Sequence, residues 1–260
     1  MKLSCLANVK RVEGSKRPQV PPHTVFATYV GDCSGSMNSQ YKASADGVYE
    51  WVKNMSSGMN NNGQDGYLTV TFFDNKIYNR IDNVSSKKIM ISMNDARNWS
   101  QPRGRTRLYD TAIEEVNMLR RRIKEYKKKF PLSTVHGVFQ LFSDGDDNMS
   151  INSVRYMNDA IKGARDDGIT CYYLGIGQDA IEVGNRYGFG EEESLTVDIG
   201  EDTSQFAFRS CSLNALRSAS TGMSESFRQN VRMRSAPTQM IQSSLNPNAK
   251  PFVPKFNLRC

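Results

Sequence analysis

Histidine is scarce in this 260-residue chain, which has only His23 and His136. Two such distant histidines give no support to a catalytic triad, which needs an imidazole beside a nucleophile and a carboxylate. Cysteine is also sparse: five residues, an odd number, stand neither at the density of a disulfide scaffold nor at metal-binding spacing. The sequence therefore argues against histidine-based hydrolysis and against a disulfide-stapled secreted domain, and it favours a reducing compartment.

Long apolar runs are missing as well. No window approaches the roughly 20 apolar residues that a membrane-spanning helix needs. The first 18 residues contain no apolar stretch of the kind found in a signal peptide. We therefore expect an intracellular, soluble protein without a membrane span, and we keep membership of a virion or another large assembly as an alternative.

The net charge of +7 is concentrated near the two ends of the sequence. Residues 1–21 carry five Lys/Arg against one Glu, and residues 221–260 carry six against one, which gives +4 and +5. The middle therefore has +7 − 9 = −2. We predict a basic N-terminal arm (1–21), a globular domain (22–220), and a basic, extended or disordered C-terminal arm (221–260) rich in Pro, Ser and Asn.

Apolar patterning in the middle region alternates between strands and helices. Short β-rich runs predict strands at 24–30, 67–73, 135–142, 170–176 and 195–199, with 76–81 as a hairpin partner and 88–93 as a weaker strand or loop. Helical spacing predicts helices at 39–55, 108–130, 153–165 and 204–219. This alternation predicts an α/β fold: a doubly wound, Rossmann-like, mostly parallel sheet with helices on both faces.

Polar side chains follow the buried strands of this predicted sheet. Ligands of open α/β sheets bind beyond the carboxyl ends of the strands, so these loops are where chemistry is expected. The first strand runs into Asp32, Ser34 and Ser36, a D-x-S-x-S arrangement, and the strand at 135–142 runs into Asp144. Thr106 stands just ahead of the longest helix. Two carboxylates and three hydroxyls are hard oxygen ligands that suit Mg²⁺ or Mn²⁺ and leave a coordination position open.

These dispersed segments resemble the von Willebrand factor A (vWA) domain. The resemblance covers about residues 22–220 and extends to Leu-Tyr-Asp at 108–110, Phe-Asp at 73–74 and Gly-Ile-Gly at 175–177. It implies a metal-ion-dependent adhesion site in which five residues hold Mg²⁺ directly or through water: Asp32, Ser34, Ser36, Thr106 and Asp144. It also implies a protein partner whose Asp or Glu completes the metal shell.

Other charged residues surround the proposed ligands. Asp110 is expected to orient the site rather than to bind metal. Arg103, Arg105 and Arg107 crowd the Thr106 loop and are candidates for binding an acidic partner. Asp146 and Asp147 follow Asp144, where they would attract metal or repel that partner.

Simpler interpretations stand beside these. A lone D-x-S-x-S is usually a polar turn or a helix cap, with Ser36 or Asn38 as the acceptor. Seven Lys/Arg between residues 120 and 129 resemble a nucleic-acid or nuclear-localisation patch, but a solvated helix face is the favoured interpretation. Cys33 lies in the metal loop, yet we expect it to face the core.

Three functions follow from the residues. The favoured one is a non-enzymatic, Mg²⁺-dependent protein-interaction module. The alternative is an assembly component of a large complex or virus particle, in which the basic arms contact other subunits and the metal only stabilises loops. A Mg²⁺-dependent phosphotransferase using Asp32 is disfavoured, because Ser34 stands where such enzymes usually have a second Asp.

Overall fold

Strands and helices alternate along the computed structural model, which describes residues 23–145, 147–197 and 201–221; within 201–221, side chains are described for 207–217. The strands are β1 (His23–Asp32), β2 (Asp65–Phe73), β3 (Ile77–Ser85), β4 (Thr134–Ser143), β5 (Ile169–Ile176) and β6 (Ser194–Val197). They form one sheet in the order β3-β2-β1-β4-β5-β6. All neighbours are parallel except β2 and β3, which form the expected hairpin.

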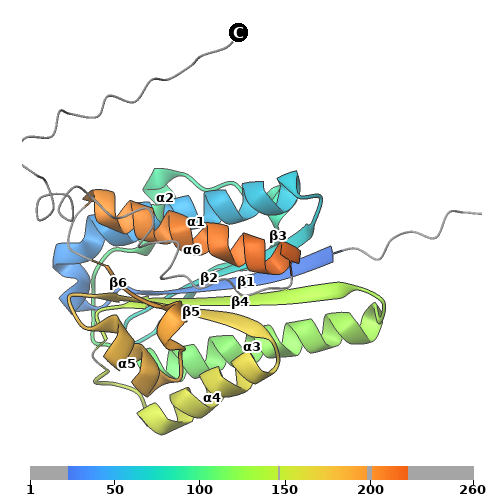
Figure 1. The fold of residues 1–260 in the computed structure, drawn as a ribbon. Helices are drawn as coiled ribbons and strands as arrows, with labels where there is room; N and C mark the ends of the chain where they lie inside the picture. Colours follow the sequence, from blue (N-terminus) through green and yellow to red (C-terminus); the bar gives the residue numbers. More distant parts are fainter. Residues whose placement is uncertain (1–22, 146, 198–200, 222–260) are drawn as a thin grey trace, which may run out of the picture.

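Helices cover both faces of the sheet (Figure 1). One face carries α1 (Tyr41–Asn61), α2 (Met93–Trp99) and α6 (Glu201–Thr221), and the other carries α3 (Leu108–Lys129), α4 (Val154–Asp166) and α5 (Ala180–Tyr187). Short 3₁₀ helices are η1 (Gly35–Gln40), η2 (Ser86–Lys88) and η3 (Glu191–Glu193). The predicted doubly wound α/β fold, with a mostly parallel sheet, is confirmed.

The central strand β1 shows why the sheet needs helices on both faces. Its side chains alternate, so that Val25, Ala27 and Tyr29 enter the core under α1 and α6. Phe26 and Val30 enter the core under α3 and α4. A strand buried on both faces reads as a nearly continuous apolar run, which is what residues 24–30 show.

Two glycines set the approach of α6 to α1. A Cβ built on Gly47 would lie 2.2 Å from a ring carbon of Phe208, and one on Gly58 would lie 2.2 Å from a methyl carbon of Leu216. Because 47 pairs with 208 and 58 with 216, the two helices run in the same direction. Both therefore end near the edge of the sheet at which β1 and β2 begin.

Several local predictions differ from the structure. Of the two alternatives for residues 88–93, a weaker strand or a loop, the structure has the loop, because Ser92 caps α2 through a capping box with Asp95. Helix α1 continues to Asn61, through part of the Asn/Gly-rich stretch that was expected to end it. Helix α5 was not predicted at all. Strand β6 ends at Val197, and residues 198–199 of its predicted span lie outside the described residues.

The predicted arms, 1–21 and 221–260, lie outside the described residues except for Thr221 at the end of α6. In the part of the chain that is described, no helix is both long and apolar enough to cross a membrane.

Candidate metal site

Three loops meet at the carboxyl edge of the sheet. After β1 the chain crosses to the face that carries α1, and after β4 it crosses to the face that carries α4. Asp32 ends β1, pairs with Phe73 of β2, and lies beside the end of β4. The backbone joins the loops: the Gly35 N–H donates to the Gly104 carbonyl at 3.2 Å, and the Arg103 N–H donates to the Cys33 carbonyl at 2.8 Å. The reversal of strand order between β1 and β4 is where open α/β sheets place their ligands.

Asp32 is fully buried at this point. Its carboxylate accepts from the Ser34 backbone N–H at 2.8 Å and from the Ser143 hydroxyl at 2.7 Å. Burial, followed by the negative charge of Asp144, raises the pKa of Asp32 to about 7 against the opposing effect of these hydrogen bonds. A buried carboxylate beside a second carboxylate is an electrostatic arrangement that a divalent cation would relieve.

The hydroxyls of the first loop lie together next to Asp32. Ser34 Oγ and Ser36 Oγ are 3.0 Å apart, with Ser34 buried and Ser36 exposed. Ser34 is the N-cap residue of η1, but its side chain makes no capping hydrogen bond. The capping interpretation of the D-x-S-x-S segment therefore gains no support at Ser34.

Thr106 is held in place by the loop that follows β4. Its backbone N–H donates to Asn148 Oδ1 at 3.0 Å, and its carbonyl accepts from the Asn148 N–H at 3.0 Å. Thr106 is buried, whereas Asp144, in the same loop as Asn148, is partly exposed. The five predicted ligands thus come from three loops tied to one another, with Ser36 and Asp144 on the solvent side.

These residues fit a hard divalent cation. No group of three or more His, Cys, Asp or Glu side chains in the described ranges is arranged to hold a metal ion. A cation held by Asp32 and Asp144 would therefore need hydroxyl oxygens as further ligands, and the sequence predicts such a set. Such an all-oxygen set suits Mg²⁺ or Mn²⁺ better than zinc or copper.

Asp110 binds the loop after β4 rather than the five residues directly. Its carboxylate accepts from the backbone N–H groups of Ile151 and Asn152, at 3.0 and 2.9 Å, and from Arg107 Nε at 2.9 Å. Burial alone would raise the pKa of Asp110, but these hydrogen bonds lower it to about 2. Asp110 therefore holds the loop that in turn holds Thr106.

The low pKa of Asp110 predicts a pH-dependent stability. A carboxyl group with a lower pKa in the folded chain stabilises the fold above its ordinary pKa of 3.8, and this contribution is lost as the pH falls through about 2. We expect Asp110→Asn to lower the free energy of unfolding by about 1 to 2 kcal/mol at neutral pH. Urea titrations should show this difference shrinking below about pH 4. A difference that stays constant down to pH 2 would contradict the assignment.

Asp147 caps the N-terminus of α3 from the same loop. Its Oδ1 accepts from the Leu108 N–H at 2.8 Å and from the Ser150 hydroxyl at 2.7 Å. This carboxylate satisfies backbone donors at the positive end of the helix dipole. The sequence placed Asp147 among residues that would attract metal or repel a ligand, whereas the structure shows it engaged as a cap. Asp146 lies outside the described residues.

Removing this cap should destabilise the fold. We expect Asp147→Ala to lower the free energy of unfolding by about 1 to 2 kcal/mol, the usual cost of losing an N-cap carboxylate. Asp159→Ala, at an exposed position of α4, provides a matched control that should stay within about 0.5 kcal/mol of wild type. Equal urea midpoints for the two variants would rule out the capping role.

The three arginines predicted to meet a partner have contacts within the chain. Arg103 lies with its guanidinium carbon 4.5 Å from the Tyr78 ring centroid and its Nε 3.7 Å from the Asp74 carboxylate. Arg107 is paired with Asp110. Arg105 is exposed and donates to the Asn148 carbonyl at 2.9 Å. All three brace the loops, and Arg105 is the most exposed of them.

Sequence reasoning missed two residues of the site and placed a third correctly. Ser143 binds Asp32 directly, and its position just before Asp144 was the available signal. Asn148 bridges to Thr106 through a loop conformation that no local pattern reveals. Cys33 lies in the core as expected, where burial raises the pKa of its thiol to about 12.

Comparison with solved structures identifies the fold. A von Willebrand factor type A protein from Catenulispora acidiphila matches with a TM-score of 0.50 at 14% identity, covering 74% of this chain and 43% of that one. The pilus adhesin SpaC from Lactobacillus rhamnosus GG matches with a TM-score of 0.55 at 13% identity, covering 79% and 31%. The PilB minor pilin from Streptococcus sanguinis matches with a TM-score of 0.51 at 13% identity, covering 75% and 62%. The chain thus has the vWA fold, and it covers less than two thirds of the length of each of these proteins.

Sequence comparisons add one short match. Residues 241–257 match the PAM2 family model, described as the ataxin-2 C-terminal region. This segment lies in the predicted C-terminal arm, outside the described residues. No curated protein matches the sequence.

Proposed function

We propose that this protein is a non-enzymatic, metal-dependent protein-interaction module. Asp32, Ser34, Ser36, Thr106 and Asp144 would hold Mg²⁺ or Mn²⁺, directly or through water. The bound ion would supply a Lewis-acidic position for an Asp or Glu of the partner. The chain's own hydrogen bonds fix the three loops. Asp32, Ser34 and Thr106 are buried, whereas Ser36 is exposed and Asp144 is partly exposed.

The observation that carries this proposal is the pair formed by Asp32 and Asp144. Asp32 is buried, its described hydrogen bonds come from an N–H and a hydroxyl, and the Asp144 charge opposes its ionisation. Placing the charge of Asp144 near the buried carboxylate of Asp32 is costly unless a cation joins them.

The surface beside the site favours a protein partner over a small ligand. Ile151 is 90% exposed, Tyr156 63% and Met149 37%; Met149 and Ile151 lie in the loop that carries Asp144, and Tyr156 lies in α4, which follows it. Large exposed apolar side chains in the segment that carries a candidate site are typical of an interaction surface. Exposed Arg105 would add attraction for an acidic group.

The described residues offer little for catalysis. His23 and His136 lie at the beginnings of β1 and β4, at the sheet edge opposite the candidate site. Cys33 is buried and its raised pKa disfavours the thiolate. Cys33, Cys171 and Cys211 are unpaired thiols, which agrees with the intracellular location that we propose.

The test is affinity capture of partners by the full-length protein in Mg²⁺, in EDTA, and with Asp144→Asn. We expect a partner that is retained only by the wild-type protein in Mg²⁺ and is eluted by free glutamate. Retention that survives both EDTA and Asp144→Asn would refute the proposal.

A second candidate function is assembly through the basic arms, with the metal serving only to stabilise loops. The match at residues 241–257 supports a role of the C-terminal arm that is separate from the metal site. Deleting residues 1–21 and 221–260 should then abolish incorporation into the assembly while Asp144→Asn leaves it intact. The opposite pattern would favour the metal-dependent module.

A further inference from the structure

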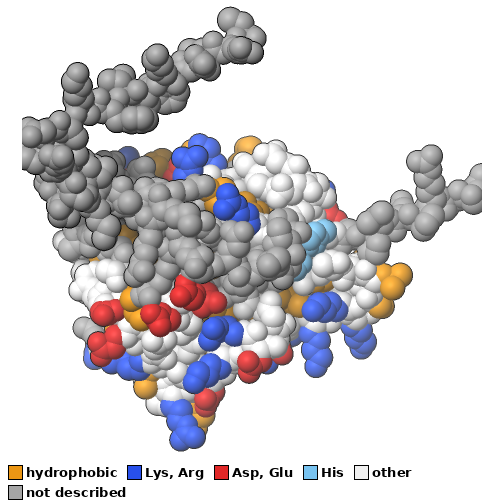
Figure 2. All heavy atoms as spheres, viewed as in Figure 1, with side chains coloured by type: hydrophobic (Ala, Val, Ile, Leu, Met, Phe, Trp, Pro, Cys, Tyr) orange, Lys and Arg blue, Asp and Glu red, His pale blue; other side chains and the backbone are white. Residues whose placement is uncertain are grey.

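A basic surface lies at the end of the molecule opposite the candidate metal site. Residues 120–129 of α3 contain seven Lys/Arg and one Glu, a net charge of +6. Helix α3 ends where β4 begins, beside the starts of β1 and β2, at the right-hand end of Figure 1. In Figure 2, Lys and Arg side chains gather at this same end, below a histidine.

Two of the seven cations form ion pairs within the protein, and Lys129 Nζ lies 5.3 Å from the centroid of the Phe130 ring. Arg120 Nε pairs with Asp167 at 2.7 Å, and Arg122 bonds Asp82 and Thr69. The other five are exposed side chains in the last part of α3: Arg121, Lys124, Lys127, Lys128 and Lys129. We name these five residues the α3 ridge. Within residues 120–129 of α3, Glu125 is the one acidic residue, so the α3 ridge keeps an excess of positive charge. This excess favours an anionic ligand.

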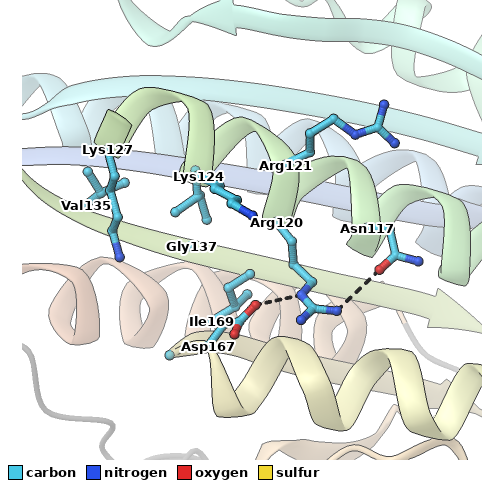
Figure 3. A pocket seen from close by; sticks show the side chains of 11 residues that line it. Asn117, Arg120, Arg121, Lys124, Lys127, Val135, Gly137, Asp167 and Ile169 are labelled. Carbon is cyan, nitrogen blue, oxygen red and sulfur yellow. Dashed lines mark hydrogen bonds and ion pairs between the residues drawn. The ribbon is translucent and has the colours of Figure 1, made fainter. Parts of the chain in front are cut away.

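A hollow of about 620 Å³ lies on one side of the ridge, between α3 and the starts of β4 and β5. Its floor is apolar, formed by Ile123, Val135 and Ile169, and its rim includes Lys124 and Lys127. Figure 3 shows Lys127 extending over Val135, Arg120 turned toward Asp167, and Arg121 extending to the opposite side of α3. The cations thus line both sides of the helix.

A second hollow of about 530 Å³ lies on the other side of α3 and is lined by aromatic rings. The rings of Phe26, Tyr67, Tyr126 and Phe130 contact one another in series, with centroids 5.0 Å apart for Phe26 and Tyr67 and 4.7 Å for Tyr126 and Phe130. Phe130 is 40% exposed at the mouth. This arrangement offers a surface on which a planar ring can stack.

We propose that the α3 ridge and the aromatic hollow bind single-stranded nucleic acid. The ridge would contact the phosphates, and an unstacked base would enter the hollow against Phe130. Basic residues beside exposed aromatic rings are the combination by which proteins bind single strands, whereas the bases of a duplex are already stacked and unavailable.

The charges inside the aromatic hollow favour a base over an acidic peptide. Asp65 and Glu125 line it together with Arg122 and Lys129. Asp65 is paired with Lys87 at 2.9 Å, and Arg122 with Asp82. The carboxylates would repel Asp or Glu side chains, but they can accept hydrogen bonds from the amino groups of a neutral base. The hollow is therefore suited to the uncharged part of a polyanion.

The test is fluorescence anisotropy of a labelled 12-nucleotide single-stranded RNA with the full-length protein over a series of salt concentrations. The triple variant Arg121→Glu, Lys124→Glu, Lys127→Glu should bind at least about tenfold more weakly. Its plot of log affinity against log salt should be shallower by about 2, the effect of losing three phosphate contacts to a single strand. This difference is separate from any contribution of the basic arms, which both proteins retain.

Matched variants distinguish the site from bulk charge. Lys53→Glu, Arg155→Glu, Lys162→Glu changes exposed residues elsewhere by the same charge and should keep the affinity within about twofold. Phe130→Ala should weaken binding about fivefold or more with an unchanged salt slope, whereas Leu132→Ala, at a residue 82% exposed, should not. Asp144→Asn should bind RNA as the wild type does. Thermal unfolding checks that each variant folds.

Three results would overturn the proposal. One is an equal loss of affinity in the two triple variants. Another is displacement of the RNA by polyglutamate at concentrations as low as those of unlabelled RNA. The third is binding of a duplex of the same length as tightly as the single strand.

Discussion

Replacing Asp144 by Asn should lower the affinity for Mn²⁺ at least about 100-fold without destabilising the metal-free protein. Loss of residues that merely support metal ligands typically costs 10- to 100-fold, so loss of a direct ligand should cost at least as much. The same change removes the negative charge that, after burial, raises the pKa of Asp32, so the metal-free variant should be as stable as the wild type or more stable. Calorimetric titration with MnCl₂ and urea unfolding in EDTA measure the two effects.

A lower affinity for Mn²⁺ together with an unchanged or higher stability distinguishes the loss of a metal ligand from misfolding. Asp159→Asn makes the same chemical change at an exposed position of α4 and should alter neither quantity. Wild-type protein that binds no Mn²⁺, or Asp144→Asn that binds it normally, would refute the metal site. A variant that simply misfolds would lose stability in EDTA, which is the opposite of the expected result.

Gly47→Ala should destabilise the fold by about 1 to 3 kcal/mol, the usual cost of overpacking a core. The new methyl group would lie 2.2 Å from the Phe208 ring, far inside van der Waals contact, so α6 would have to move away from α1. At a helix position with room for the methyl group, the same substitution is stabilising, because alanine lowers the conformational entropy of the unfolded chain and favours the helix.

Gly163→Ala in α4 provides that comparison. The nearest atoms to its new methyl group belong to the flexible guanidinium end of Arg120, at 3.3 Å. We expect a gain of about 0.5 to 1 kcal/mol in the free energy of unfolding. Urea denaturation of the two variants should therefore give shifts of opposite sign. Shifts of the same sign would show that the α1–α6 contact is less tightly packed than the structure indicates.

Much of the fold could be predicted because its strongest signals are local. The apolar run of β1 and the stripe of α3 from Leu108 to Ile123 are visible in the sequence, and both are buried as expected. Phe130, the last residue of the predicted helix, lies just beyond the end of α3 at Lys129 and is 40% exposed. The spacing of apolar residues predicts well which face of a helix is buried, but it does not show where the elements that cover this face end.

The missed helix α5 shows what short elements conceal. It has eight residues, of which only Ala180, Gly184 and Tyr187 are buried, too few for a clear period. Its ends carried the better signal. Asp179 accepts from two backbone N–H groups at the start, and Gly188 adopts φ +96° at the end.

Asp32, Ser34, Ser36 and Asp144 could be placed by the rule that loops after parallel strands share an edge, whereas Thr106 precedes α3 and was placed by the resemblance. The residues that support these candidate ligands could not be predicted. Asp147 and Leu108 are 39 positions apart, and Asp110 and Ile151 are 41 apart. These contacts depend on the folded path of the loop after β4. Asp147 was predicted to attract metal or repel a partner, and Arg105 to bind a partner. In the structure both form hydrogen bonds that hold this loop.

The exchange of carboxylates between α3 and this loop has a thermodynamic consequence. Asp147 of the loop satisfies the first turn of the helix, and Asp110 of the helix satisfies the loop. Neither segment keeps its hydrogen bonds if the other leaves, so the two form a single cooperative unit. Since this unit carries both Thr106 and Asp144, local opening would withdraw two of the five proposed oxygen donors together, and we expect the affinity for a cation to be lost in one step rather than ligand by ligand.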